Sequence, residues 1–201
     1  MEPVDVVNLA LDHLGQSILT ALTDSNDTAR RCSRRYDTIR KAELRDHDWI
    51  FASNRATLEY STTNLGGYEW TYSYNVATDC LKIRAFYPQE EYGYRWKVEK
   101  GDQASGIYRR ILTNVASPVR IRFTEDIEDP DDFDPLFVEA LAARIAAELA
   151  LPITNDPEIV KTMWAMYDAK IGSARLNDAI EAQDPDQDAP GADEGTWITD
   201  R

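Results

Sequence analysis

Residues 134–151 read DPLFVEALAARIAAELAL, and this stretch predicts an amphipathic helix. Asp134 is a favourable N-cap, and Pro135 fits the first helical position because its missing N–H would have no partner there. The apolar residues that recur every four positions, and so share one face, are Phe137, Leu141, Ile145 and Leu149. We expect Pro152 to end this helix, since proline offers no N–H to the turn before it.

The same start signal returns at Asp156-Pro157 and predicts a following helix. Its expected buried stripe consists of Ile159, Met163, Tyr167, Ile171 and Ala174. The repeated Asp-Pro is a capping device used twice and is no evidence of a duplicated sequence.

Two further helices are expected near the start of the chain. The first begins at Pro3 and closes at Gly15, with Val4, Val7, Leu11 and Leu14 at helical spacing. The second begins at the N-cap residues Ser25-Asn26-Asp27 and runs to about Asp48. Its apolar side consists of Ala29, Cys32, Tyr36 and Ile39, and its other face carries Arg30, Arg31, Arg34, Arg35, Arg40, Lys41 and Arg45.

Between the two helical pairs the apolar pattern changes to a period of two, which is typical of strands. The expected strands are Ala56–Tyr60, Trp70–Val76, Cys80–Tyr87, Tyr94–Glu99, Ile107–Thr113 and Val119–Thr124. The short linkers favour antiparallel hairpins, because parallel strands need longer crossovers. The predicted fold is therefore α+β, a four-helix bundle with an antiparallel β block inserted between its second and third helices.

The predicted elements divide the chain into four parts. A helical pair spans 1–52, a β block 53–124, and an acidic loop with a second helical pair 125–182. Residues 183–201, rich in Asp, Pro and Gly, form an acidic arm that we expect to be disordered, because they bury too little apolar area to offset ordering entropy. Trp197-Ile198 inside this arm is either a docking motif or an incidental pair.

The net charge of −14 is concentrated in two segments. Residues 125–134 hold seven acids and no base, and residues 178–201 hold eight acids and one base. Such a chain is a poor candidate for binding duplex DNA. No apolar run is long enough to span a membrane, and the acidic N-terminus does not resemble a signal peptide. The two cysteines, Cys32 and Cys80, are expected to be small buried residues of a protein made in a reducing cytoplasm.

No motif for a phosphate-binding loop, a metal site or a nucleophile elbow occurs, so we expect no cofactor and no catalytic residue. Paired carboxylates are the one feature of the sequence that could support catalysis, since glycan hydrolysis uses two of them. Asp129, Asp131 and Asp132 could supply such a pair, but they are expected in a flexible loop, whereas catalysis needs rigid support. A tail-associated glycan hydrolase therefore stays as an alternative function.

Three groups of residues are candidates for binding other proteins. The aromatic residues Tyr68, Trp70, Tyr72, Tyr92 and Tyr94 form either the buried face of a small sheet or a contact surface, with base stacking on single strands as a weaker option. The arginines Arg30, Arg34, Arg35 and Arg45 are either a solvated face or a contact with an acidic partner. That partner could be the segment with Asp129, Asp131 and Asp132 on a neighbouring copy, a head-to-tail contact that closes into a ring.

The order of these features resembles tail tubular protein A and related head–tail adaptors of short-tailed bacteriophages. The motifs that carry the resemblance are an N-x-x-L-x-x-L-G helix, Trp49 with Phe51, Asp79-Cys80-Leu81, the strands in 94–123, the acidic Asp129–Phe137 and the Ala-rich EALAARIAAELALPI, and together they cover about residues 5–182. The chain departs from the family pattern at Gln16, where Glu is common, and at Ala77-Thr78, where Pro is common. These departures leave the adaptor subfamily open.

The resemblance implies a structural virion protein at the head–tail junction, assembled in the host cytoplasm. Adaptors of this family form a ring, by likeness a dodecamer, between the portal protein and a tail nozzle or tail-completion protein, with tail fibres as a further neighbour. The four helices would build the ring wall and the β block, with its aromatic residues, would face the tail. The arm carrying Trp197 and Ile198 would dock on the portal, and genome DNA would pass the channel without specific binding. Another kind of virion interaction protein remains an alternative.

Overall fold

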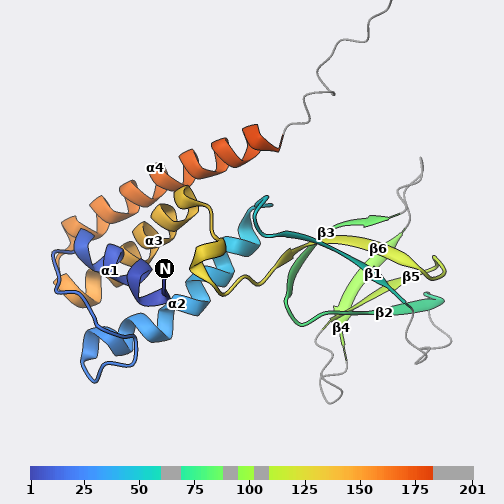
Figure 1. Cartoon of the computed structure of the whole chain (residues 1–201), viewed down its shortest axis with the longest axis horizontal. Coiled ribbons are helices and arrows are strands. Elements are labelled where there is room, and N and C mark those ends of the chain that lie inside the picture. The colour runs from blue at the N-terminus through green and yellow to red at the C-terminus, as the bar shows by residue number, and fades with distance from the viewer. Residues whose placement is uncertain (60–68, 88–94, 102–108, 183–201) are drawn as a thin grey trace, which may run out of the picture.

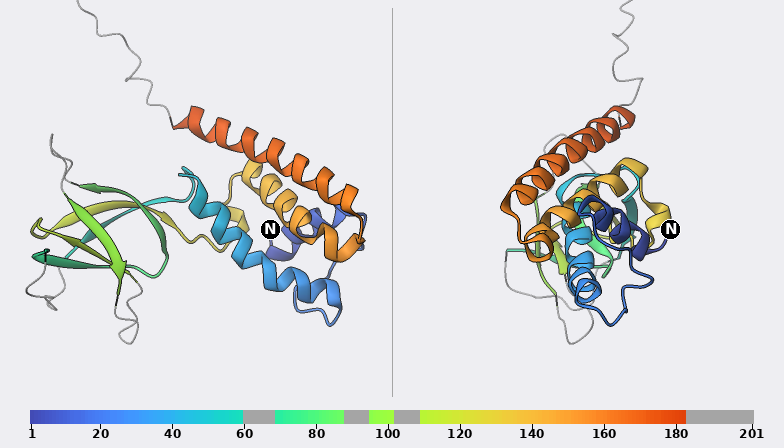
Figure 2. Two further views of the ribbon diagram at one scale, coloured as in Figure 1. Left: turned by 180° about the vertical axis from the view of Figure 1, so that it is seen from behind. Right: turned by 90° about the vertical axis from the view of Figure 1, so that its left-hand side faces the viewer.

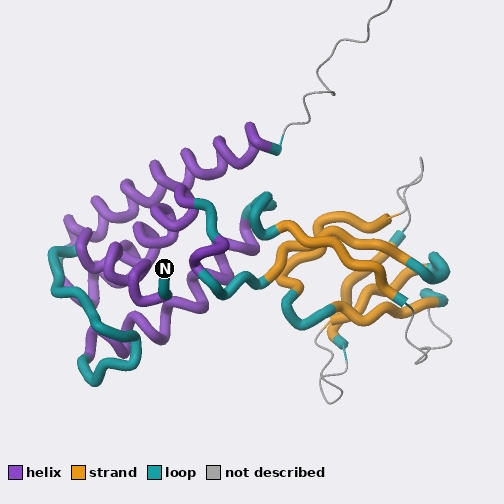
Figure 3. The backbone as a smooth tube through the Cα atoms, viewed as in Figure 1, coloured by secondary structure: helices purple, strands orange, loops and turns teal. Residues whose placement is uncertain are grey.

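The computed structural model describes residues 1–59, 69–87, 95–101 and 109–182 of the 201-residue chain. In these ranges the fold is α+β, with four α-helices and two antiparallel sheets of three strands each. Helices gather in one lobe and strands in the other, and we call these the helical lobe and the β lobe (Figure 1 and Figure 3). No helix of the described ranges combines the length and apolar character needed to cross a bilayer.

The first two helices begin where the capping signals predict. α1 (Pro3–His13) carries a capping box between Glu2 and Asp5. α2 (Asp27–Asp46) begins after Asn26, whose side chain accepts a hydrogen bond from the backbone N–H of Ala29 at 2.7 Å. This bond satisfies one of the free N–H groups of the first turn.

The third helix, α3 (Pro135–Thr154), begins as predicted but continues past Pro152. Asp134 accepts hydrogen bonds from the N–H groups of Leu136 and Phe137, which fixes the start. The expectation that Pro152 ends the helix is wrong, because a proline in the last turn removes only one hydrogen bond of the helix. The actual end is Asn155, which adopts the left-handed conformation (φ 53°) and donates its N–H to the carbonyl of Leu151.

The helical lobe is organised around α3, which contacts each of the other three helices. α4 (Pro157–Glu181) lies along one side of it, as Figure 2 shows. The predicted apolar faces form the core, including Phe137, Leu141, Ile145 and Leu149 of α3 and Met163, Tyr167, Ile171 and Ala174 of α4. Ile159 is only partly buried against this core.

The β lobe consists of two sheets with strand orders β1-β6-β3 and β2-β5-β4. The strands are β1 (Ser53–Leu58), β2 (Tyr72–Val76), β3 (Cys80–Tyr87), β4 (Trp96–Lys100), β5 (Arg109–Thr113) and β6 (Val119–Glu125). All the pairs are antiparallel, as predicted, but within the described strands only β4 and β5 are neighbours both in sequence and in a sheet. The expected series of hairpins is therefore wrong, and β1 instead pairs with β6.

The two lobes are joined by a buried ion pair between α2 and the segment after β6. Arg40 is 1% exposed, and its guanidinium Nη1 lies 2.7 Å from the Asp126 carboxylate, which is 11% exposed. Arg40 also donates to the carbonyl of Ile127, and Lys41 lies 2.6 Å from the second oxygen of Asp126. The expectation that Arg40 belongs to an exposed face is wrong, because α2 turns this position toward the exit of the β lobe.

Arg40→Ala should lower the free energy of unfolding by about 3 kcal/mol, because it leaves the mostly buried Asp126 with Lys41 as its one remaining ion-pair partner among the described residues. Urea denaturation at neutral pH measures this loss. Arg34→Ala, which removes an exposed arginine of the same helix, is the matched control and should cost less than about 0.5 kcal/mol. Equal effects of the two substitutions would show that the ion pair does not hold the lobes together.

Candidate functional site

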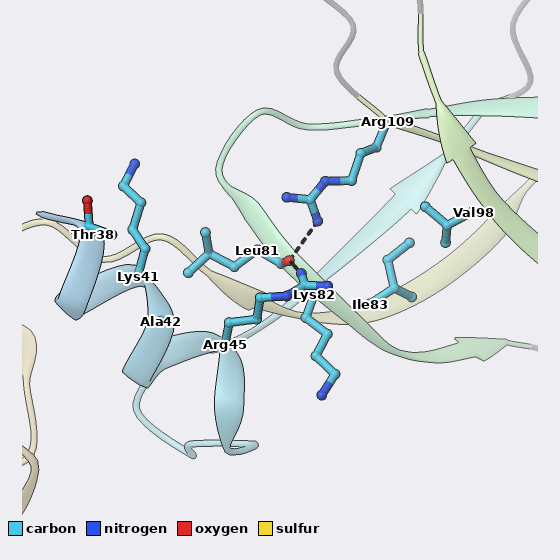
Figure 4. A pocket seen from close by; sticks show the side chains of 9 residues that line it. All are labelled: Thr38, Lys41, Ala42, Arg45, Leu81, Lys82, Ile83, Val98 and Arg109. Carbon is cyan, nitrogen blue, oxygen red and sulfur yellow. Dashed lines mark hydrogen bonds between the residues drawn. The ribbon is translucent and has the colours of Figure 1, made fainter.

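A basic groove lies between the two lobes, where the exposed side of α2 faces the start of β3 and the nearby strands β4 and β5 (Figure 4). Its volume is about 700 Å³. Four cationic side chains line it, namely Lys41 and Arg45 of α2, Lys82 of β3 and Arg109 of β5. No carboxylate is among the nine lining residues. Lys41 contacts Asp126 outside the groove, whereas the other three cations have no ion pair in the described ranges and leave the groove with an excess of positive charge.

Two arginines of the groove converge on one backbone oxygen. Arg109 donates to the carbonyl of Leu81 at 2.6 Å, and Arg45 donates to the same oxygen. Neither arginine has an ion pair within the described part of the chain, where the other junction arginines, Arg40 and Arg84, each contact an aspartate. Two guanidinium groups held this close repel each other, so an anion placed beside them would be bound favourably.

Apolar side chains complete the groove. Leu81 and Ile83 come from β3, and Val98 of β4 is 38% exposed. The groove therefore presents cations beside an apolar patch, a combination that fits a ligand carrying both negative charge and apolar groups.

Cys80 lies next to the groove but is not a reactive thiol. Burial raises its pKa to about 11, although the neighbouring Arg109 and Arg45 act in the opposite direction. A thiol with such a pKa stays protonated at neutral pH, and only a thiolate is a good nucleophile. Cys32 is buried as well, so both cysteines are free, buried residues, as the sequence indicates.

The predicted arginines of α2 divide into two groups. Arg45 lines the groove near the end of α2. Arg30, Arg34 and Arg35 lie on the exposed face in the first half of the same helix. Arg30 lies 3.3 Å from Asp27, and Arg35 lies 3.3 Å from Glu148 of α3. Arg31 and Arg34 form no ion pair in the described ranges, so their charge faces outward.

The acidic segment contains a short helical turn that the sequence did not predict. Pro130–Asp132 form the short 3-10 helix η2, and the Asp129 side chain caps it by accepting from the N–H of Asp131 at 2.9 Å. The Asp131 carboxylate contacts the amino group of Met1. The predicted loop around Asp129, Asp131 and Asp132 therefore contains a short helical turn, and both its capping bond and the contact with Met1 lie within the same subunit. None of the three lines the groove.

The predicted aromatic contacts are only partly within the described residues. Trp70 precedes β2, with the guanidinium of Arg95 5.7 Å from its ring centre, and Tyr72 packs partly buried against the core of the β lobe. Tyr74 of the same strand is fully buried in that core. Tyr68, Tyr92, Tyr94, Trp197 and Ile198 lie outside the described residues.

A second basic surface, on β1 and β6, was not predicted from the sequence. Arg55 of β1 is the direct cross-strand partner of Arg122 of β6, and Arg120 lies two positions along the same strand. Arg122 contacts Asp48 at 2.9 Å, whereas Arg55 and Arg120 form no ion pair in the described part of the chain. The alternation of Arg120 and Arg122 along β6 was the available signal, but the pairing of β1 with β6 could not be read from it.

A buried carboxylate lies inside the helical lobe. Glu43 of α2 accepts a hydrogen bond from the hydroxyl of Tyr167 at 2.8 Å and lies 3.7 Å from Arg144, whose guanidinium stacks over Trp164 at 4.8 Å. Burial raises the pKa of Glu43 above its ordinary value, and the hydrogen bond from Tyr167 only partly opposes this. The described residues contain no cluster of three His, Cys, Asp or Glu side chains that could hold a metal ion.

Glu43→Gln should gain stability relative to the wild type as the pH rises. A buried carboxyl with a raised pKa must lose its proton inside the fold, so the wild type loses stability between the ordinary pKa of 4.5 and the raised value. The glutamine variant lacks this loss. Urea denaturation at about pH 4 and about pH 8 measures the difference, with the exposed Glu139→Gln as control. A pH-independent difference would contradict the effect of burial.

No family model matches the chain, and no curated protein matches it.

Proposed function

We propose that the chain is a structural head–tail adaptor of a tailed bacteriophage, a subunit of a ring that joins the portal protein to the tail nozzle or tail-completion protein. The observation that carries the proposal is the resemblance of the ordered motifs, from the first helix to the Ala-rich α3, to the adaptor family. The α+β architecture with four helices agrees with the fold that this family implies.

The connection between the lobes supports a mechanical role. Beyond the Arg40–Asp126 pair, Arg84 of β3 donates to the backbone carbonyls of Arg45 and His47 at the end of α2. Asp48, which follows α2, lies 2.9 Å from Arg122. These contacts restrain the β lobe against the helical lobe, as a protein that transmits force along a virion axis requires. We infer that the helices form a bundle that builds the ring wall and that the β lobe faces the tail.

Charge complementarity supports a head-to-tail contact between copies. Arg31 and Arg34 are exposed cations without an ion pair in the described ranges, and Asp129 and Asp132 are exposed acids on another part of the same lobe. A contact between different patches of identical subunits is heterologous and forms a ring when its rotation closes. We infer a ring of this kind, a dodecamer by likeness to the family.

Exposed apolar residues on α4 provide a further surface for neighbours. Leu176 is 63% exposed and Ile180 is 58% exposed, and four residues of spacing place them side by side on the helix. Together with Leu151, which is 53% exposed near the end of α3, they are candidates for burial in an assembly.

The remaining roles follow from the adaptor proposal. The acidic C-terminal segment with Trp197 and Ile198 would reach the portal, and tail fibres are a further lateral partner. The genome would pass through the channel without specific binding, and the subunit would assemble in the host cytoplasm into the virion. No catalytic step is part of the proposal.

The wild-type protein should form rings stacked coaxially on its portal protein, and reversing the charge of α2 should prevent this. Arg31→Glu with Arg34→Glu places acids against the acids of the next copy, which costs binding free energy through like-charge repulsion. Adding Asp129→Lys and Asp132→Lys to the same chain exchanges the two charges and should restore the rings. Electron microscopy of the mixture with portal protein counts the rings in each case.

The control carries the same charge change elsewhere, with Lys100→Glu on β4 and Lys161→Glu on α4, and should still form rings. Wild-type protein that never binds the portal would contradict the adaptor role. Portal-bound rings that tolerate the α2 reversal would refute only the assigned contact between copies.

A further inference from the structure

We propose that the basic groove between the lobes binds the acidic C-terminal segment of this polypeptide, residues 183–201, either of the same chain or of a neighbouring copy. The proposal goes beyond the adaptor role and does not depend on it, because groove and segment both belong to this chain. Its consequence for an adaptor would be that groove and portal compete for one segment.

The first argument is charge. Three cations of the groove, Arg45, Lys82 and Arg109, form no ion pair in the described ranges, and Lys41 contacts Asp126. Residues 183–201 contain six acids and one base. The other acid-rich segment, 125–134, is anchored within its own subunit, where Asp126 binds Arg40 and Lys41 and Asp131 binds the amino terminus. The C-terminal segment is therefore the better match for the unneutralised arginines.

The second argument is the apolar patch of the groove. Leu81, Ile83 and Val98 lie beside the cations, so a purely acidic peptide would leave them uncovered. Residues 193–200 read DEGTWITD, in which Trp197-Ile198 is flanked by acids on both sides. Burying these two side chains on the patch would add a hydrophobic contribution to the charge contacts.

The third argument is reach. Asp178, near the end of α4, accepts a hydrogen bond from the N–H of Ile50 at 2.9 Å and lies 3.0 Å from the ring nitrogen of His47. The end of α4 is thereby fixed at the end of α2, two residues from Arg45 of the groove. Nineteen residues beyond Ala182 extend to about 60 Å when fully stretched, which is enough to reach a groove on either copy.

Photochemical crosslinking of the full-length protein tests the proposal. With the photoreactive p-benzoylphenylalanine in place of Trp197, irradiation followed by mass spectrometry should find crosslinks to Leu81, Lys82, Ile83 or Val98. Lys82→Glu with Arg109→Gln should reduce this yield at least fivefold, since it removes groove charge while glutamine keeps a donor for the Leu81 carbonyl. Mixing isotope-labelled and unlabelled chains distinguishes binding within one chain from binding between copies.

The matched control is Arg55→Gln with Lys161→Glu, which makes the same charge change outside the groove and should leave the crosslink yield unchanged. As a second measurement on the unsubstituted groove, a synthetic 183–201 peptide should suppress the crosslink, whereas a peptide with all six acids replaced by their amides should not. Crosslinks confined to other surfaces, or equal suppression by both peptides, would overturn the proposal. No portal is present, so this failure would leave the adaptor role untouched.

Discussion

The buried contact between Arg40 and Asp126 is the constraint on which the two-lobe structure depends. A guanidinium group taken out of water needs partners for its charge and its donors, and Arg40 finds them in Asp126 and the carbonyl of Ile127. Only its Nε lacks a hydrogen-bond partner within the described ranges. Those acceptors lie in the segment that leaves β6 toward α3. The chain therefore returns from the β lobe to the helical lobe at a point fixed by α2.

Helix α2 consequently presents three chemically different sides. Its apolar side, with Ala29, Cys32 and Leu44, packs into the helical core, and Arg40 joins the lobes. The exposed side carries cations toward the solvent and, at Lys41 and Arg45, toward the groove. All three sides belong to one rigid helix. A partner bound at the groove or on the exposed face would therefore be held in a fixed position relative to both lobes. This arrangement suits a protein whose work is to hold neighbours in register.

The helices could be predicted because their signals are local. Asp134-Pro135 and Asp156-Pro157 each place a capping side chain beside a proline, and both helices start there. The failures arose where tertiary contacts decide the outcome. Helical spacing alone could not show that Arg40 faces a carboxylate 86 residues away in sequence. Nor could it show that Pro152, so close to the helix end, would be accommodated.

The candidate site shows the same division. Arg45 could be singled out because it belongs to an arginine-rich helix, but Lys82 and Arg109 come from strands whose pairing depends on contacts between distant residues. Tyr74 lies on the same strand as the proposed contact residue Tyr72, yet its side chain is buried in the core of the β lobe. Alternation reports which residues share a face of a strand, and only the packed structure tells which face is covered.

The proposed role of this protein is to connect the portal of a virion to its tail. Electron microscopy and titration of particles assembled by a phage from which this gene is deleted test it most directly, with the wild-type gene supplied in trans as control. The account predicts DNA-filled or leaking heads without attached tails and a loss of infectivity that the supplied gene restores. Complete, tailed and infectious particles in the absence of this polypeptide would contradict it.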